Sequence, residues 1–237
     1  MRPAALAAML AVLLPARSAR AEDAALGHQV AVGLTGVYDA GHDRGLQYGL
    51  SYELAVSAMR VAALLALGDT DPRREQHWAL SVGAVPLDSL RIDVGLHHRT
   101  FTHIGFGENL VTIVISLDWR GLEVTAGWVL RFPITDRDRI HSPFVFERDL
   151  FEHFLCFRLG YVWQLGRGVG LGVLAGTISR YEIHNLDYPQ FAVVLTYSHP
   201  RVGSFRLDGG IGTAGFFNQG STIDRGFLRL EYVYERR

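Results

Sequence analysis

The residues with the clearest chemical potential are three histidines in a short stretch, His97, His98 and His103, with Glu108 a little further along the chain. Imidazole and carboxylate groups bind metals and transfer protons, so such a cluster is the first place to look for a metal or catalytic site. The cluster lacks the ligand spacing of a zinc site and has no cysteine partner. This composition is typical of polar residues at the end of a strand, and we predict no catalytic, metal or cofactor site here.

Other chemical motifs are equally weak. Cys156 is the only cysteine, so no internal disulfide can form, and we interpret it as a small strand residue. Gly105 and Gly107 have the spacing of part of a phosphate loop, but no helix is expected after them. The acidic residues within 136–149 alternate with arginines. This alternation favours pairing within the loop over binding of a calcium ion.

The strongest pattern in the chain is an alternation of apolar and polar residues over 109–132. Apolar residues occupy positions 111, 113, 115 and 117 before Trp119-Arg120-Gly121, and positions 122, 124, 126, 128, 130 and 132 after it. Such alternation predicts two strands joined by a tight turn, with one apolar and one polar face. The apolar face would be buried in a soluble sandwich, or would face lipid in a membrane barrel whose polar face lines the lumen.

Composition and the N-terminus narrow this choice. The chain of 237 residues is 49% hydrophobic with a formal charge of -1, and it has no long apolar run beyond its N-terminus, which argues against a helical membrane protein and a nucleic-acid-binding protein. Arg2, the apolar stretch 4–14 and Ala19-Arg20-Ala21 form the pattern of a secretory signal peptide. We therefore predict that residues 1–21 are a signal peptide and that residues 22–237 form one exported domain.

Similar hairpins recur along this domain, with short turns after even strands and longer polar loops after odd ones. The sequence predicts an all-β fold, a closed antiparallel transmembrane β-barrel of about twelve strands, in which residues 168–181 form one strand. The stretch from Leu54 to Leu67 is rich in Ala and Leu, and a helix there would leave ten strands plus a short helix. Its alternation favours a strand, and a turn near Ser57 would place Glu53 across from Arg60.

This pattern resembles that of bacterial outer-membrane β-barrel proteins over the whole exported domain. Such barrels commonly end in an aromatic-terminated strand that the barrel-assembly machinery recognises, and residues 226–234 look like that signal, although Glu235-Arg236-Arg237 follow them. The resemblance implies an outer-membrane location and contact with membrane lipid and lipopolysaccharide. Aromatic residues near the expected strand ends would form interfacial girdles: Trp78, Trp119, Tyr161, Trp163, Tyr181, Tyr197, Phe217, Tyr232 and Tyr234.

Strand parity also predicts which side chains face the lumen. Charged side chains that faced lipid would each cost a few kcal/mol near the middle of the bilayer, so the polar phase of each strand must face inward. The predicted lumen-lining residues are Glu53, Arg60, Arg91, Asp93, His97, Arg99, Glu123, Arg131, Glu152, Arg158, Arg206, Asp208, Arg229 and Glu231. Inward glycines would leave space between them: Gly33, Gly49, Gly83, Gly95, Gly127, Gly160, Gly170, Gly172, Gly176, Gly210 and Gly212.

Three functions are compatible with such a barrel. The balanced charges and the glycines favour a narrow pore for small hydrophilic solutes, while the same charges could instead pair into a closed structural barrel or serve one that binds a partner. Barrel-type outer-membrane phospholipases and lipid A deacylases often carry a His-x-Ser pair, and no histidine here is followed two residues later by serine. A lipid-modifying enzyme therefore stays an alternative that no sequence motif supports.

Overall fold

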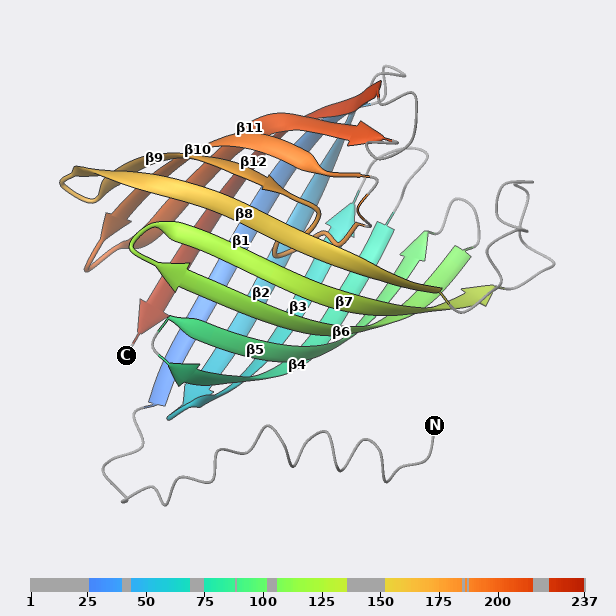
Figure 1. Ribbon diagram of the computed structural model, residues 1–237, viewed down its shortest axis with the longest axis horizontal. Helices are drawn as coiled ribbons and strands as arrows, with labels where there is room; N and C mark the ends of the chain where they lie inside the picture. Colours follow the sequence, from blue (N-terminus) through green and yellow to red (C-terminus); the bar gives the residue numbers. More distant parts are fainter. Residues whose placement is uncertain are drawn as a thin grey trace.

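Twelve antiparallel strands close into one barrel (Figure 1). This computed structural model describes residues 26–39, 44–68, 75–87, 89–101, 106–135, 152–184, 186, 188–214 and 222–236. Each strand pairs with its neighbours in sequence, and β1 pairs with β12 to close the ring, which confirms the predicted architecture. The strands are β1 (Leu26–Asp39), β2 (Arg44–Val56), β3 (Met59–Gly68), β4 (Glu75–Leu87), β5 (Leu90–Phe101), β6 (Phe106–Trp119), β7 (Leu122–Thr135), β8 (Glu152–Gly166), β9 (Val169–Gly176), β10 (Gln190–His199), β11 (Gly203–Ala214) and β12 (Thr222–Arg236).

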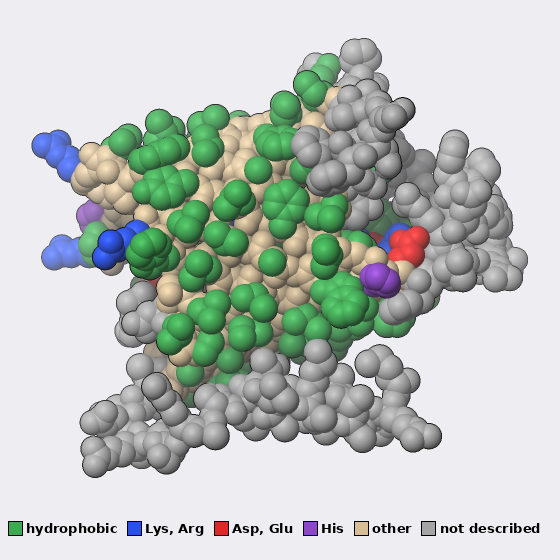
Figure 2. Space-filling model, in the orientation of Figure 1, with side chains coloured by type: hydrophobic (Ala, Val, Ile, Leu, Met, Phe, Trp, Pro, Cys, Tyr) green, Lys and Arg blue, Asp and Glu red, His purple; other side chains and the backbone are tan. Residues whose placement is uncertain are grey.

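Apolar side chains are spread over the face of the barrel that Figure 2 shows, and exposed large apolar residues occur on each of the twelve strands. On β1 and β2, Val32 and Leu50 are each 50% exposed, whereas the alternate residues Ala31 and Ser51 are buried. A soluble protein rarely exposes so continuous an apolar surface, but a membrane barrel presents it to lipid. Closure also removes every sheet edge, which is the condition for strands to cross hydrocarbon.

The outer surface also carries most of the aromatic residues expected near strand ends. Trp78, Trp119 and Trp163 are 52%, 54% and 49% exposed. Tyr161, Tyr197 and Tyr234 are exposed in the same way, and the half-buried Tyr232 donates a 2.5 Å hydrogen bond to the carbonyl oxygen of Val202. Phe217 lies outside the described residues. Tyr181 is the exception, because it is buried in the interior, and its assignment to a girdle is wrong.

The stretch from Leu54 to Leu67 forms strands rather than a helix. β2 continues to Val56, a turn follows at Ser57, which has a φ of 54°, and β3 begins at Met59. The register pairs Glu53 with Ala62 rather than with Arg60, but the Arg60 guanidinium reaches diagonally to the Glu53 carboxylate. In the described part of the chain, no helix is long and apolar enough to cross a membrane.

Short turns join the strands at one end of the barrel. They include Arg167 and Gly168 between β8 and β9, and residues 200–202 between β10 and β11. Because short turns face the periplasm in outer-membrane barrels, cysteines placed at Arg167 and Arg201 should resist a membrane-impermeant thiol reagent added to intact cells. Labelling of both positions in intact cells would invert this orientation. The corresponding expectations at Asp71, Arg139 and Asp187 (labelled) and at Asp88 (protected) lie outside the described residues.

The chain departs from the predicted pattern after β9. This strand ends at Gly176, so the prediction of a strand that continues to Tyr181 is wrong. Residues 177–184, called here the inner segment, turn into the barrel instead of extending its rim (Figure 1). The next strand, β10, begins at Gln190.

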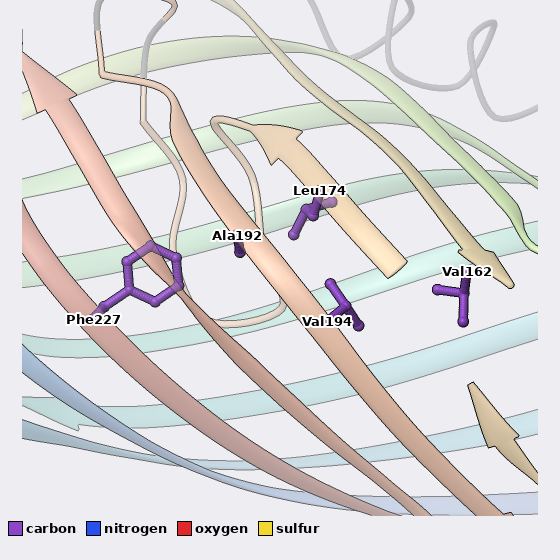
Figure 3. Close-up of a cluster of buried hydrophobic side chains, with 5 residues drawn as sticks. All are labelled: Val162, Leu174, Ala192, Val194 and Phe227. Atoms are coloured by element: carbon purple, nitrogen blue, oxygen red, sulfur yellow. The ribbon is translucent and has the colours of Figure 1, made fainter. Parts of the chain in front are cut away.

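Part of the inner wall is apolar. Val162, Leu174, Ala192, Val194 and Phe227 form a buried cluster contributed by β8, β9, β10 and β12 (Figure 3). All five residues lie in the inward phase of their strands, which therefore contains apolar as well as charged residues. The charged side chains of the interior therefore share the lumen with a packed apolar region.

Candidate functional site

The interior holds ion pairs that cross the lumen. The Glu53 carboxylate on β2 binds Arg60 on β3 and, at 2.9 Å, Arg91 on β5, and Arg91 lies 2.6 Å from Asp93. β2 and β5 are not neighbours in the barrel, so the Glu53–Arg91 contact must reach past β3 and β4 through the interior. We call these four residues the Glu53 group.

A second set of charges lies across β5 to β8. Glu108 binds both Arg99 and Arg131, and Arg131 is 2.7 Å from Glu152. The side chain of Glu108 is only 1% exposed, compared with 41% for that of Glu152. Burial of one carboxylate between two guanidiniums satisfies its charge, and this Glu108 group is therefore a tightly paired network.

A third set joins strands that are not neighbours in the barrel. The two oxygens of Glu123 on β7 contact Arg158 on β8 at 2.8 Å and Arg206 on β11 at 2.7 Å. Arg206 also lies 2.8 Å from Asp208, which is 3.8 Å from Arg229 on β12. Because β7 and β11 are separated by three strands, the Glu123–Arg206 contact spans the lumen. These residues form the Glu123 group.

His97 and His98 face opposite sides of β5. His97 faces inward, where its ring stacks on His77 and its Nε2 lies 3.1 Å from the hydroxyl oxygen of Thr112. His98 faces outward, with Nδ1 2.8 Å from Oδ1 of Asn109. His103 lies outside the described residues, and the described residues contain no group of three or more His, Cys, Asp or Glu placed to hold a metal ion.

The inner segment has its own folded shape. Ile178 and Ile183 form a β-bridge, the Ser179 amide donates to the Glu182 carbonyl at 2.8 Å, and the His184 amide donates to the Thr177 carbonyl at 2.8 Å. The Glu182 amide in turn donates to the Ser179 hydroxyl. These bonds close a small hairpin whose tip carries residues 180 and 181.

Apolar contacts seat one side of this hairpin. Ile183 is packed with Leu110, Val129 and Cys156 of β6, β7 and β8, and Ile178 lies against the same cluster. Cys156 is buried within this cluster, in agreement with its interpretation as a small strand residue. The base of the hairpin is thus fixed on the β6–β8 wall.

Tyr181 fills a space made by two glycines on the opposite wall. Gly33 on β1 and Gly49 on β2 are direct partners in the sheet, and a Cβ atom on either would lie 2.3 Å from the Tyr181 ring. The Tyr181 side chain is therefore packed where other residues would carry side chains, and burial raises its pKa to about 12. The space that these two inward glycines leave is occupied, not open.

Charged contacts hold Arg180 and Glu182, the residues on either side of Tyr181. Arg180 lies 2.8 Å from Glu231 and donates to the Ser51 hydroxyl at 3.0 Å. Glu182 lies 2.6 Å from Arg229, 3.9 Å from Arg225, and accepts a 2.8 Å hydrogen bond from Gln190. Burial alone would raise the pKa of Glu182, but the Arg225 and Arg229 guanidiniums outweigh it and hold that pKa below its usual range. The Glu182 carboxylate is therefore ionised at neutral pH.

A cavity of about 410 Å³ lies between the inner segment and the wall. Its lining includes Glu53 and Arg91 from one charged group, Glu123 and Arg206 from another, and Arg180 from the inner segment. Serine and threonine side chains of the wall also line it, and so do apolar side chains that include Leu64, Val114, Ile178 and Ile183. The interior thus contains a space in which charges of both signs lie beside apolar side chains.

All the predicted lumen-lining residues take part in these contacts, and their role in conduction stays a prediction. Sequence reasoning missed His77, Glu108 and Arg225 as lumen residues, although each lies in the inward phase of its strand. It also missed Arg180 and Glu182. One feature of the sequence indicates that β9 ends before residue 177. If the strand continued, the polar residues Thr177 and Ser179 would face lipid.

Comparison with known proteins rests on structure alone, since no family model and no curated protein sequence matches the chain. A KdgM porin in complex with disordered oligogalacturonate aligns with a TM-score of 0.53 at 8% identity, covering 87% of this chain and 99% of that one. A NanC porin aligns with a TM-score of 0.53 at 10% identity, covering 87% and 100%. The chain has the fold of a bacterial outer-membrane β-barrel. At such identities the likeness to these outer-membrane barrels establishes the fold and leaves function to the site itself.

Proposed function

We propose that this outer-membrane β-barrel is a narrow channel for small hydrophilic solutes. The observation that carries the proposal is the cavity of about 410 Å³ inside the barrel, which charged residues of the Glu53 and Glu123 groups line beside apolar side chains. A barrel serving only as a scaffold would gain from filling this space with apolar side chains, because burying ion pairs is costly. Twelve strands also give an interior between the filled eight-stranded and the open sixteen-stranded cases.

The setting that we propose follows from the same architecture. Residues 1–21 would direct export, and this stretch lies outside the described residues. β12 would present the assembly signal to the barrel-assembly machinery, supported by the outward, exposed Leu228 and Leu230. The apolar outer wall would contact membrane lipid and lipopolysaccharide, and the lumen small solutes.

Ion selectivity tests the channel. Charged rings at close quarters set the preference of a pore, so replacing Arg91 and Arg158 together by glutamine should shift permeability toward cations. Replacing Asp93 by asparagine and Glu123 by glutamine should shift it toward anions, since Arg91, Arg158 and Arg206 each then lose one carboxylate partner. Reversal potentials in planar bilayers under a salt gradient measure both shifts. If protein that migrates as a folded barrel in electrophoresis gives no conductance in these bilayers, the proposed channel function is wrong.

A second candidate activity, hydrolysis of membrane lipid, is favoured by one contact on the outer wall. His98 faces the lipid side, and a proton on its Nδ1 donated to Oδ1 of Asn109 leaves Nε2 free as a base. Thr100, two residues further along β5, lies in the same outward phase and would supply the hydroxyl nucleophile.

Lipid turnover distinguishes this enzyme from the channel. Folded protein in phospholipid vesicles should release fatty acid if the second candidate is correct, and His98→Ala should abolish that release. His97→Ala is the matched control, because His97 faces the lumen and has no access to lipid. Release that survives His98→Ala, or no release at all, would discard the enzyme and leave the channel untouched.

A further inference from the structure

The inner segment crosses the lumen from wall to wall. Its isoleucines pack on β6, β7 and β8, Tyr181 lies against β1 and β2, and Glu182 contacts β10 and β12. A segment that contacts walls on several sides narrows the path along the barrel axis at this level. The channel proposed above is therefore obstructed in this conformation.

The base and the tip of the hairpin formed by the inner segment are held in different ways. At the base, the Thr177 amide donates to the Phe157 carbonyl at 2.7 Å, a main-chain bond that continues the sheet. At the tip, Arg180 and Glu182 are held by ion pairs and Tyr181 by packing, and the side chains of His77 and Arg99 bond to the main-chain carbonyls of Tyr181 and Ile183. Since the hairpin is closed by its own bonds, the tip can leave the wall without unfolding the segment.

The wall around Glu182 is an anion-binding site. Arg225, Arg229 and Gln190 all belong to β10 or β12, and they direct donors at one carboxylate. Without Glu182, the nearest acidic partner of Arg229 would be Asp208 at 3.8 Å. Paired guanidiniums are well suited to carboxylates, and the inner segment supplies the carboxylate that fills the site here.

We propose that the inner segment is a releasable plug, and that a solute carboxylate bound by Arg225, Arg229 and Gln190 takes the place of Glu182 and releases it. This inference rests on the proposed channel. Glu182 and a solute carboxylate compete for the same donors, so binding of the solute favours the conformation in which the tip has left the wall. A ligand that binds one of two conformations better shifts their populations in this way.

Substitution of Glu182 tests the plug. Glu182→Gln keeps the shape of the side chain but removes the charge that Arg225 and Arg229 bind, so the variant should show a several-fold larger conductance than the wild type in planar bilayers. Glu152→Gln is the matched control, because it also removes one lumen carboxylate but does not touch the inner segment. It should shift ion preference toward anions without the increase in conductance.

Acetate tests the competition. Potassium acetate replacing chloride at constant ionic strength should raise the open probability of the wild type, and should have no such effect on Glu182→Gln, whose plug is already released. Tyr181→Ala, which empties the Gly33–Gly49 space without altering charge, should raise conductance as Glu182→Gln does. This second variant keeps the test decisive if Glu182→Gln does not fold, as judged by electrophoretic mobility.

The outcomes separate the plug from the channel. If the wild type conducts and Glu182→Gln and Tyr181→Ala conduct no better, the inner segment is a fixed constriction and the plug is overturned. If Glu152→Gln raises conductance as much as Glu182→Gln, charge loss alone explains the effect and the plug is again overturned. If every folded variant is silent, the channel itself fails.

Discussion

Replacing Glu108 by glutamine is expected to destabilise the barrel by about 3–5 kcal/mol, the usual cost of removing one partner from a buried ion pair. The side chain of Glu108 is 1% exposed, and its carboxylate is shared by Arg99 and Arg131. Arg131 would keep Glu152, but Arg99, which also bonds to the Ile183 carbonyl, would lose the carboxylate that it binds directly. Urea unfolding of the micelle-bound protein, followed by tryptophan fluorescence, measures the loss.

Glu152→Gln is the matched control for this prediction. Glu152 contacts the same Arg131 but is 41% exposed, and exposed ion pairs contribute about 0–1 kcal/mol because water screens them. The two variants remove the same charge from the same network and differ in burial. Equal losses in the two variants would show that the Glu108 group is hydrated rather than buried.

The sequence was informative about the barrel because alternation is a local property. Each strand carries its own apolar phase, and an error of one residue would turn charges such as Arg91 or Glu123 toward lipid. The same reasoning separates His97 from His98, since neighbouring residues of a strand point to opposite faces. Applied at every position, it would also have found Glu108 and His77.

The partners of the charges were less predictable. Glu53 meets Arg91 and Glu123 meets Arg206 across strands that are not neighbours, so these pairs depend on the width of the barrel and on the stagger of its strands. The local pattern of residues along the chain contains neither the width of the barrel nor the stagger of its strands. Balanced charge predicts that lumen residues pair, but it does not identify the pairs.

The inner segment was the largest error, and its cause is physical. Alternation was extended from β9 to Tyr181, although Thr177 and Ser179 are poor lipid-facing residues. What draws the chain inward is the space above Gly33 and Gly49, far away in the sequence. A sequence shows that both positions lack side chains, but only the closed barrel shows which residue fills the space.

The second large effect that we expect is a loss of stability in the variants Gly33→Ala and Gly49→Ala, which place a methyl group in that space. A methyl group at either position would lie 2.3 Å from the Tyr181 ring, well inside van der Waals contact. Overpacking of this kind costs about 1–3 kcal/mol, because the ring must shift or leave its seat. Each variant should therefore unfold at lower urea concentration than the wild type.

Gly36→Ala is the control on the same strand, since its new methyl group would have no neighbour closer than 3.9 Å. Its stability should stay near that of the wild type. The decisive comparison is Gly33→Ala in a Tyr181→Ala background, where the missing ring leaves room for the new methyl group and the penalty should largely disappear. Neighbouring residues that share one space show such coupling in double-mutant cycles, whereas independent sites give additive losses. If Gly33→Ala loses as much stability in the Tyr181→Ala background as in the wild type, Gly33 serves the bending of β1 rather than the packing of Tyr181. The inner segment would then be anchored at its tip by Arg180 and Glu182 alone.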